Sequence, residues 1–219
     1  MAPDGAEQTA VSPYRPRMDV ADVKRGAVVV HLISFCGGPE RPDGIENFVQ
    51  SWGARMTVLD VLRDKEHDMA DEGRWAQHRE KLTEGVYDAG WYAPPCCSFC
   101  ANRGRGPGPR ALRGALPPDL YGLPHLKLQE KETVRIGTCL AARCAESATL
   151  FHSQNKPFGF EQPKRRPGKP SMYNLDELLA VAKRVNFRTS VQCMLGAKRL
   201  KPTNIMNFLL DFVNFFQAL

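Results

Sequence analysis

The chain has 219 residues, of which 42% are hydrophobic and 25% are charged. This length and composition are typical of a globular protein with one domain or slightly more, and they exclude collagen, a coiled coil and a wholly disordered chain. The longest apolar run, residues 27–33, is interrupted by His31. It is far shorter than the roughly 20 residues that cross a bilayer, so we expect no membrane partner.

The N-terminal residues and the cysteines predict where the protein resides. The first 20 residues have no apolar stretch and contain Asp4 and Glu7, unlike a secretory signal. The seven cysteines are odd in number, and Cys96 and Cys97 are adjacent. We therefore expect reduced thiols in an intracellular protein, nuclear if the source is a eukaryote.

Basic residues are concentrated in three segments of a chain whose net charge is +6. The segments 101–118, 163–170 and 198–201 contain eleven Lys or Arg residues and no acid, so the rest of the chain is net negative. Such clusters favour a polyanionic partner, although solvated loops that keep a protein soluble have the same composition. The candidate nucleic-acid contacts are Arg103, Arg105, Arg110, Arg113, Lys164, Arg165, Arg166, Lys198, Arg199 and Lys201.

Apolar runs of strand length alternate with amphipathic segments along the chain. Residues 1–25 lack periodicity and predict a mobile arm. The runs predict strands, and the amphipathic segments predict helices, the first of which opens at Asp43 with Glu46 as a capping box. Expected strands cover 27–33, 55–59, 86–92, 157–161 and 187–193, and expected helices follow Asp43 and cover 74–84, 127–151 and 175–185.

This alternation predicts an α/β fold with a mostly parallel sheet. We expect one domain over residues 26–203, with a long Gly/Pro/Arg loop at 101–125 and a separate apolar tail at 204–219. Ligands bind outside the carboxyl ends of the strands in such folds. The unusual residues follow predicted strands, namely the Ser34–Gly38 turn, Asp60, Cys96 and Glu161.

The glycine turn and Asp60 together predict a nucleoside cofactor. A glycine turn lets a ligand approach backbone N–H groups, and an acid at the end of the second strand is placed to bind ribose hydroxyls. The G-x-G-x-x-G spacing that binds a pyrophosphate is absent. S-adenosylmethionine, which has no pyrophosphate, therefore fits better than a dinucleotide.

Cys96 and Glu161 are the candidate catalytic residues. A thiol that follows Pro94-Pro95 near several arginines is favoured as a nucleophile, but a structural cysteine and a zinc ligand beside Cys97 and Cys100 are alternatives. Because no further ligand pair stands nearby, no metal is expected. Glu161 could share a proton with a ring nitrogen, or it could be a helix cap or a surface ion pair.

The ordered motifs of residues 28–205 resemble those of DNA cytosine-5 methyltransferases. The resemblance rests on Phe35-Cys-Gly-Gly38, Asp60, His67-Asp68-Met69, Pro95-Cys-Cys-Ser-Phe-Cys100 and Phe160-Glu-Gln-Pro163. It implies a Rossmann-like methyltransferase fold with helices on both faces of the sheet. It also implies that the protein transfers a methyl group from S-adenosylmethionine to C5 of cytosine in DNA.

The resemblance assigns a role to each motif. Cys96 would attack C6 of a flipped cytosine, and Glu161 would hold the base through N3 and the exocyclic amine. The cofactor would contact Phe35, Gly37, Gly38, Asp60, Asp68 and Pro95.

Three departures from the family pattern leave another interpretation open. Cys97 replaces a glutamine, Gln192 is not followed by the expected arginines before Arg199, and no room remains for a large target-recognition domain. A non-catalytic nucleic-acid-binding domain on the same fold, such as one from a mobile element, would keep the basic segments without needing Cys96. RNA is a further candidate substrate, and the sequence sets neither the target site nor the oligomeric state.

Overall fold

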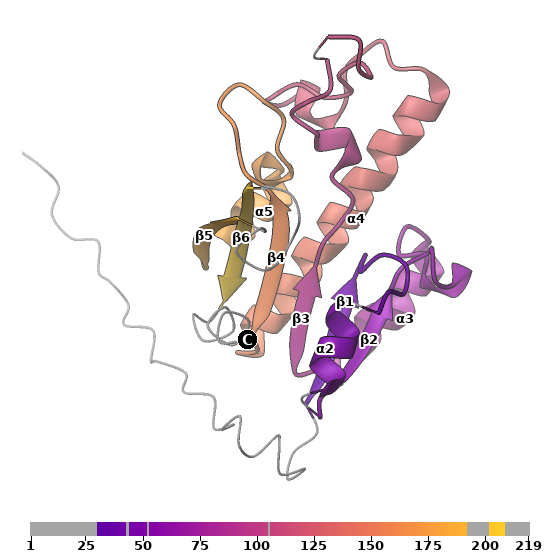
Figure 1. Cartoon of the computed structure of the whole chain (residues 1–219), viewed down its shortest axis with the longest axis vertical. Coiled ribbons are helices and arrows are strands. Elements are labelled where there is room, and N and C mark those ends of the chain that lie inside the picture. Colours follow the sequence, from indigo (N-terminus) through magenta and orange to yellow (C-terminus); the bar gives the residue numbers. More distant parts are fainter. Residues whose placement is uncertain (1–29, 43, 52, 105, 192–201, 209–219) are drawn as a thin grey trace, which may run out of the picture.

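Six strands form one mixed sheet in the computed structural model of the chain, which describes residues 30–42, 44–51, 53–104, 106–191 and 202–208 (Figure 1). Within these residues four α-helices pack on the sheet. The strands are β1 (His31–Phe35), β2 (Arg55–Leu59), β3 (Ala89–Tyr92), β4 (Phe158–Pro163), β5 (Asn186–Val191) and β6 (Pro202–Phe208). The helices are α2 (Ile45–Ser51), α3 (Glu72–Thr83), α4 (Leu128–Ser153) and α5 (Asp176–Ala182).

The strand order is β2-β1-β3-β4-β6-β5. The first three pairings are parallel, whereas β6 pairs antiparallel with both β4 and β5. The expectation of an α/β fold is confirmed, but the expectation of a mostly parallel sheet is wrong because two of the five pairings are antiparallel. Since β6 alone is reversed, β1 to β5 all point their carboxyl ends to the same edge.

Strand β6 occupies part of the segment that the sequence predicted as a separate apolar tail. Met206 and Asn207 are fully buried, and Thr203 and Asn204 are nearly so. Buried polar residues beside apolar ones hide the alternation that marks a strand, and they are found here because β6 lies between two other strands. The rest of the predicted tail lies outside the described residues.

Helices cover both faces of the sheet. Strand β1 shows the division, because Leu32 packs toward Val49 of α2, while Ile33 belongs to the larger core with α3, α4 and α5. Successive side chains of a strand point to opposite faces. Among the described residues, none of the helices has the length and apolar character needed to cross a membrane.

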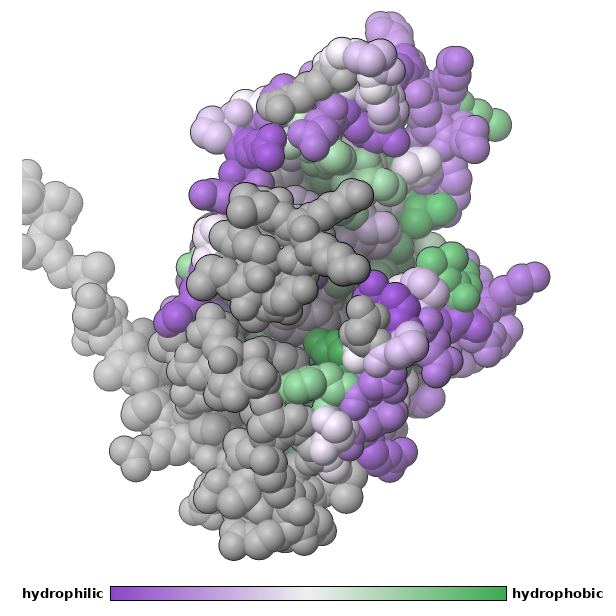
Figure 2. Space-filling view, viewed as in Figure 1, coloured by the Kyte–Doolittle hydropathy of each residue, from purple (hydrophilic) through white to green (hydrophobic). Residues whose placement is uncertain are grey.

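The segment between η2 (Cys97–Phe99) and α4 forms a small lobe beyond the carboxyl edge of the sheet, at the top of Figure 1. Leu112, Leu126 and Val134 form an apolar cluster of their own there. Arg110 forms an ion pair with Glu130, whose carboxylate also accepts the Lys127 N–H in a capping box at the start of α4. Figure 2 shows a mostly hydrophilic surface over this lobe.

Candidate functional site

The exits of β1 and β3 meet at the point where the strand order reverses. The chain passes from β1 to β2 on one side and then returns to β3 on the other side of β1. The Ala93 N–H donates to the Phe35 carbonyl at 3.1 Å, which holds the two exits side by side. Ligands of open α/β sheets bind in the crevice outside such a switch point.

The glycine turn after β1 is fixed to the end of β2 by Asp60. The Gly38 N–H donates to one carboxylate oxygen of Asp60 at 2.8 Å, and the Leu62 N–H donates to the other at 2.8 Å. Gly38 has a φ of +79°, which favours glycine. A Cβ on Gly37 would lie 2.7 Å from Cγ1 of Val58, so this residue packs too closely for a side chain.

The surroundings of Asp60 fit the nucleoside part of S-adenosylmethionine. Each carboxylate oxygen accepts one N–H and keeps a lone pair for a ribose hydroxyl. Apart from its two neighbours in the chain, no described residue has an atom within 4 Å of a Cβ built on Gly38, so a ligand has room to approach that backbone. Val61 is 52% exposed next to Asp60 and offers an apolar surface for a base. Sequence reasoning missed Val61, although its place directly after a strand-end acid was a usable signal.

Arg63 connects the glycine turn to α2. Its Nε donates to the Gly38 carbonyl at 2.7 Å, and its Nη2 pairs with the buried Glu46 of α2 at 2.5 Å. Glu46 was expected to form a capping box with Asp43, which lies outside the described residues. The ion pair to Arg63 instead links α2 to the loop after β2.

The other predicted cofactor contacts differ in their accessibility. Phe35 is 1% exposed and its ring packs against Trp75 and Tyr92, so only its backbone is left to contact a cofactor, and the predicted contact stays a prediction. Asp68 is half-buried at the end of the η1 turn (Lys65–His67) and accepts the Ala70 N–H at 2.9 Å. Pro95 is exposed on the loop after β3.

Cys96 lies on a loop that is tied to the end of β4. Pro94 is buried, and its carbonyl accepts a hydrogen bond from Nε2 of Gln162 at 2.7 Å. The Cys96 carbonyl accepts the Phe99 N–H at 2.9 Å, which opens the η2 turn. Cys96 is half-buried in a cleft of about 20 Å³ that it shares with Gln162 and Lys164. This cleft has room for about one water molecule.

Cys96 and Gln162 line the same cleft, and Glu161 does not line it. Glu161 and Gln162 are adjacent in β4, so their side chains belong to opposite faces of the sheet. Gln162 is on the face of Phe160 and the larger core. Glu161 is on the face of Gly159, against which the Trp91 ring packs. The two predicted catalytic residues therefore lie at the ends of neighbouring strands, on different faces.

Among the described cysteines, Cys144 is buried and Cys36 is half-buried. Burial, together with the charge of Asp60, raises the pKa of Cys36 to about 12, and burial also raises the pKa of Cys144. Both thiols stay protonated at neutral pH and are poor nucleophiles. Cys97 is exposed, and Cys96 and Cys100 are half-buried. In the part of the chain that the structure describes, no group of three or more His, Cys, Asp or Glu residues could hold a metal ion.

Several predicted nucleic-acid contacts are engaged within the protein. Arg113 is 2% exposed, so the prediction that it contacts nucleic acid is wrong. Arg103 donates to the carbonyls of Cys97 and Arg110, while Arg110 pairs with Glu130. Arg165 donates to the Tyr173 carbonyl, and its guanidinium lies over the rings of Tyr173 and Phe187.

The remaining basic residues near the cysteine loop lie between β4 and α5. Lys164 and Arg166 are exposed there, and Lys169 is half-buried. The other predicted nucleic-acid contacts lie outside the described residues, namely Arg105, Lys198, Arg199 and Lys201. Gln192 also lies outside them.

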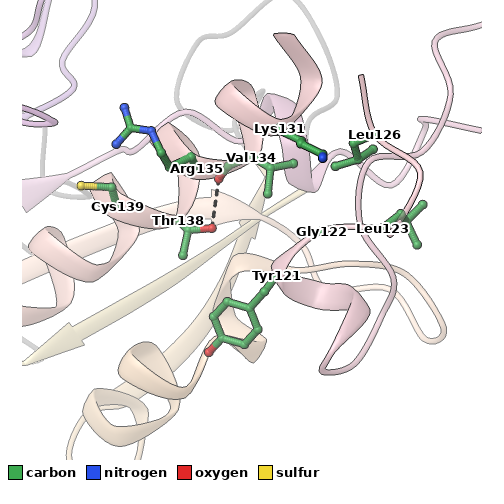
Figure 3. A pocket seen from close by; sticks show the side chains of 9 residues that line it. All are labelled: Tyr121, Gly122, Leu123, Leu126, Lys131, Val134, Arg135, Thr138 and Cys139. Atoms are coloured by element: carbon green, nitrogen blue, oxygen red, sulfur yellow. Dashed lines mark hydrogen bonds between the residues drawn. The ribbon is translucent and has the colours of Figure 1, made fainter. Parts of the chain in front are cut away.

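A wider hollow of about 510 Å³ runs along the first turns of α4 (Figure 3). Lys131, Arg135 and Cys139 approach it from α4, and Tyr121 and Leu123 approach it from the preceding loop. None of the predicted site residues lines this hollow, and Cys96 opens into the smaller cleft instead.

Comparison of the chain with models of protein families, with curated proteins and with solved structures finds no match. The methyltransferase resemblance therefore rests on the sequence motifs.

Proposed function

We propose that the protein transfers a methyl group from S-adenosylmethionine to C5 of cytosine in DNA, with Cys96 as the nucleophile. The observation that carries the proposal is the Gln162–Pro94 hydrogen bond of 2.7 Å, because it joins the Pro-Pro-Cys loop to the Glu-Gln-Pro end of β4. The Asp60–Gly38 contact lies at the same edge of the sheet. Nucleophile, base-binding acid and nucleoside-binding acid thus belong to one edge.

The order and direction of the strands support the proposal. Strands β1 to β5 share one direction, the switch point lies between β1 and β3, and helices cover both faces. This arrangement is compatible with a Rossmann-like methyltransferase fold.

Cys96 and Glu161 would share the covalent chemistry. The Cys96 thiolate forms a bond to C6 of the cytosine while a protonated Glu161 gives its proton to N3, and the electron pair of the C5–C6 double bond moves toward C5. C5 would then form a bond to the methyl carbon as the bond from that carbon to the sulfonium sulfur breaks, so that S-adenosylhomocysteine is the leaving group. Loss of the C5 proton to a base restores the double bond and expels the Cys96 thiolate, and the N3 proton returns to Glu161.

The cofactor would be held beside this chemistry by the glycine turn and the loop after β2. Bound S-adenosylmethionine supplies an electrophilic methyl group. Asp60 would accept hydrogen bonds from the ribose hydroxyls, Val61 would cover one face of the adenine, and Gly38 would leave room for the methionine part.

The cleft at Cys96 must open before a base can enter. Its volume of about 20 Å³ holds one water molecule but not a pyrimidine. Because Glu161 belongs to the opposite face of β4, a cytosine that touches both residues has to lie across the end of this strand. Lys164, the first residue of the exposed 164–168 segment, lines the cleft beside Cys96.

Covalent trapping on DNA that contains 5-fluorocytosine tests the proposal. Fluorine at C5 cannot leave as a proton does, so a cysteine-dependent enzyme stays attached to the DNA when S-adenosylmethionine is present. We expect trapping by the full chain, none by Cys96→Ala, and retained trapping by the matched control Cys97→Ala.

Calorimetric titration with S-adenosylmethionine separates the two candidate functions. We expect Cys96→Ala to bind the cofactor within a few-fold of the unaltered protein, and Asp60→Ala to lose binding. If folded protein binds no cofactor and forms no covalent product, the non-catalytic nucleic-acid-binding interpretation replaces this proposal.

A further inference from the structure

A buried arginine holds the cysteine loop to the rest of the molecule. Arg113 is 2% exposed and contacts three other segments of the chain, namely η2, η3 (Asp119–Tyr121) and α4. Its Nε donates to Oγ of Ser98 in η2 at 3.1 Å, and its Nη1 donates to the Leu120 carbonyl at 2.8 Å. Its Nη2 donates to the Val134 carbonyl of α4 at 2.7 Å and to Oγ1 of Thr138 at 3.0 Å.

Within the described residues, the charge of Arg113 has no acidic partner. All four hydrogen bonds go to neutral groups, and no carboxylate in the described ranges forms an ion pair with it. Its guanidinium carbon lies 3.7 Å from the centre of the Phe99 ring, a cation–π contact. Burial lowers the pKa of Arg113 to about 10, so the side chain is still a cation at neutral pH.

A buried cation without a counter-charge is costly unless its surroundings are fixed around it. The close packing around Arg113 depends on Gly137 of α4. A Cβ at this position would lie 2.8 Å from Oγ of Ser98 and 3.4 Å from Nη2 of Arg113. The absence of that Cβ lets the η2 turn and the guanidinium approach the helix closely.

The contacts of Arg113 hold the part of the backbone that carries Cys96. Ser98 and Phe99 both contact Arg113, and the Phe99 N–H donates to the Cys96 carbonyl at 2.9 Å. On the other side, Nε of Arg103 donates to the Cys97 carbonyl at 2.8 Å. A loop held at these points presents the Cys96 thiol in one place.

We propose that Arg113 is the positioning residue of the cysteine loop. It touches neither substrate nor cofactor, and it fixes η2 to α4 so that Cys96 meets its target in one geometry. The link to catalysis rests on the function proposed above. A misplacement of about 1 Å at a reacting atom costs on the order of 100-fold in rate.

The test uses the full chain with Arg113→Met, Arg113→Lys and the milder Ser98→Ala. Leu126→Ala is the stability control, because Leu126 belongs to the apolar cluster of the same lobe, which includes no η2 residue. For each folded variant we would measure hydrogen exchange of the 97–100 amides, the rate at which iodoacetamide alkylates Cys96, and the yield of covalent product on fluorocytosine DNA. Peptide mass spectrometry assigns the alkylated cysteine.

We expect Arg113→Met to speed exchange of the 97–100 amides, to change Cys96 alkylation, and to cut trapping on the order of 100-fold at an unchanged affinity for S-adenosylmethionine. Arg113→Lys should lose nearly as much, since an ammonium cannot bridge three segments as a guanidinium does. Ser98→Ala should show a smaller change of the same kind.

Exchange and alkylation that match those of Leu126→Ala would overturn the positioning role, whatever the trapping result. If exchange and alkylation change as expected but the unaltered protein forms no covalent product, the positioning role stands and the proposed reaction fails.

Discussion

Nε2 of Gln162 donates a hydrogen bond of 2.7 Å to the carbonyl of Pro94, across 68 residues of sequence. Both groups are buried where β4 ends and where the chain leaves β3. Pro94 lies two residues before Cys96, and Gln162 directly follows Glu161. This single contact therefore couples the two segments that would carry the chemistry.

Replacing Gln162 by leucine should lower the free energy of unfolding by about 1–3 kcal/mol, because the buried Pro94 carbonyl loses its donor. The substitution should also reduce trapping on fluorocytosine DNA. Urea unfolding and trapping yield would be measured on the same samples. Gln129→Leu, on the exposed side of α4, is the matched control and should change neither quantity. Equal behaviour of the two variants would contradict a structural role for the Gln162–Pro94 contact.

Gly137→Ala should destabilise the protein, although alanine is normally the better residue inside a helix. The added Cβ would lie 2.8 Å from Oγ of Ser98, so the cysteine loop must shift. Overpacking of this kind costs about 1–3 kcal/mol. Thermal unfolding and Cys96 alkylation would report the effect. Gly73→Ala on α3 meets no atom closer than 3.4 Å and should be neutral or stabilising. A stabilised Gly137→Ala would show that the packing around Ser98 is loose.

The basic residues between β4 and α5 should carry a larger share of DNA binding than an equal number of basic residues elsewhere on the protein. Replacement of Lys164, Arg166 and Lys169 by alanine should weaken binding and reduce the slope of log affinity against log salt by about 2–3. A set of equal charge on α3 and after α5, namely Lys81, Lys183 and Arg184, is the control. Salt titrations of binding would compare the two. The same loss in both sets would mean that only net charge matters.

The lobe should lose stability in acid because of Glu130. Hydrogen bonds from Arg110, and then from the Lys127 N–H, lower the pKa of Glu130 from its usual 4.5 to about 2. A depressed carboxyl pKa contributes stability above the unfolded value of about 4.5, and this contribution is lost as the pH falls toward 2. Glu130→Gln should therefore be less stable than the unaltered protein at pH 7.

That difference between Glu130→Gln and the unaltered protein should shrink as the pH falls from 4.5 toward 2. Urea unfolding over this range would measure it, with Glu80→Gln on the exposed side of α3 as the control. A difference that stays constant down to pH 2 would contradict the role of the Glu130 charge.

Local sequence patterns predicted several elements well. The expected strand at 55–59 has the same bounds as β2, and the expected helix at 127–151 agrees with α4 within two residues. Both depend on the periodicity of neighbouring side chains, which the chain carries by itself. The expected strands at 27–33 and 86–92 correspond to the shorter or shifted β1 and β3, because pairing with neighbours decides where a strand begins.

The candidate site was predicted in part for the same reason. The contact between Asp60 and the Gly38 turn follows from the order of strands and could be anticipated. Sequence patterns could not predict which face of the sheet Glu161 belongs to, nor that Cys96 and Gln162 line one cleft. Both depend on the register between β3 and β4.

The sequence by itself determined the α/β class, most of the elements, and the position of the unusual residues after strand ends, because these are properties of short segments. Only the tertiary structure decided that 202–208 pairs between β4 and β5, and that Arg113 is buried. An arginine in a basic loop looks like a surface charge until carbonyls from η3 and α4 surround it. Those partners come from separate parts of the chain. Long-range packing therefore decides that Arg113 is a buried internal contact, which local sequence patterns could not predict.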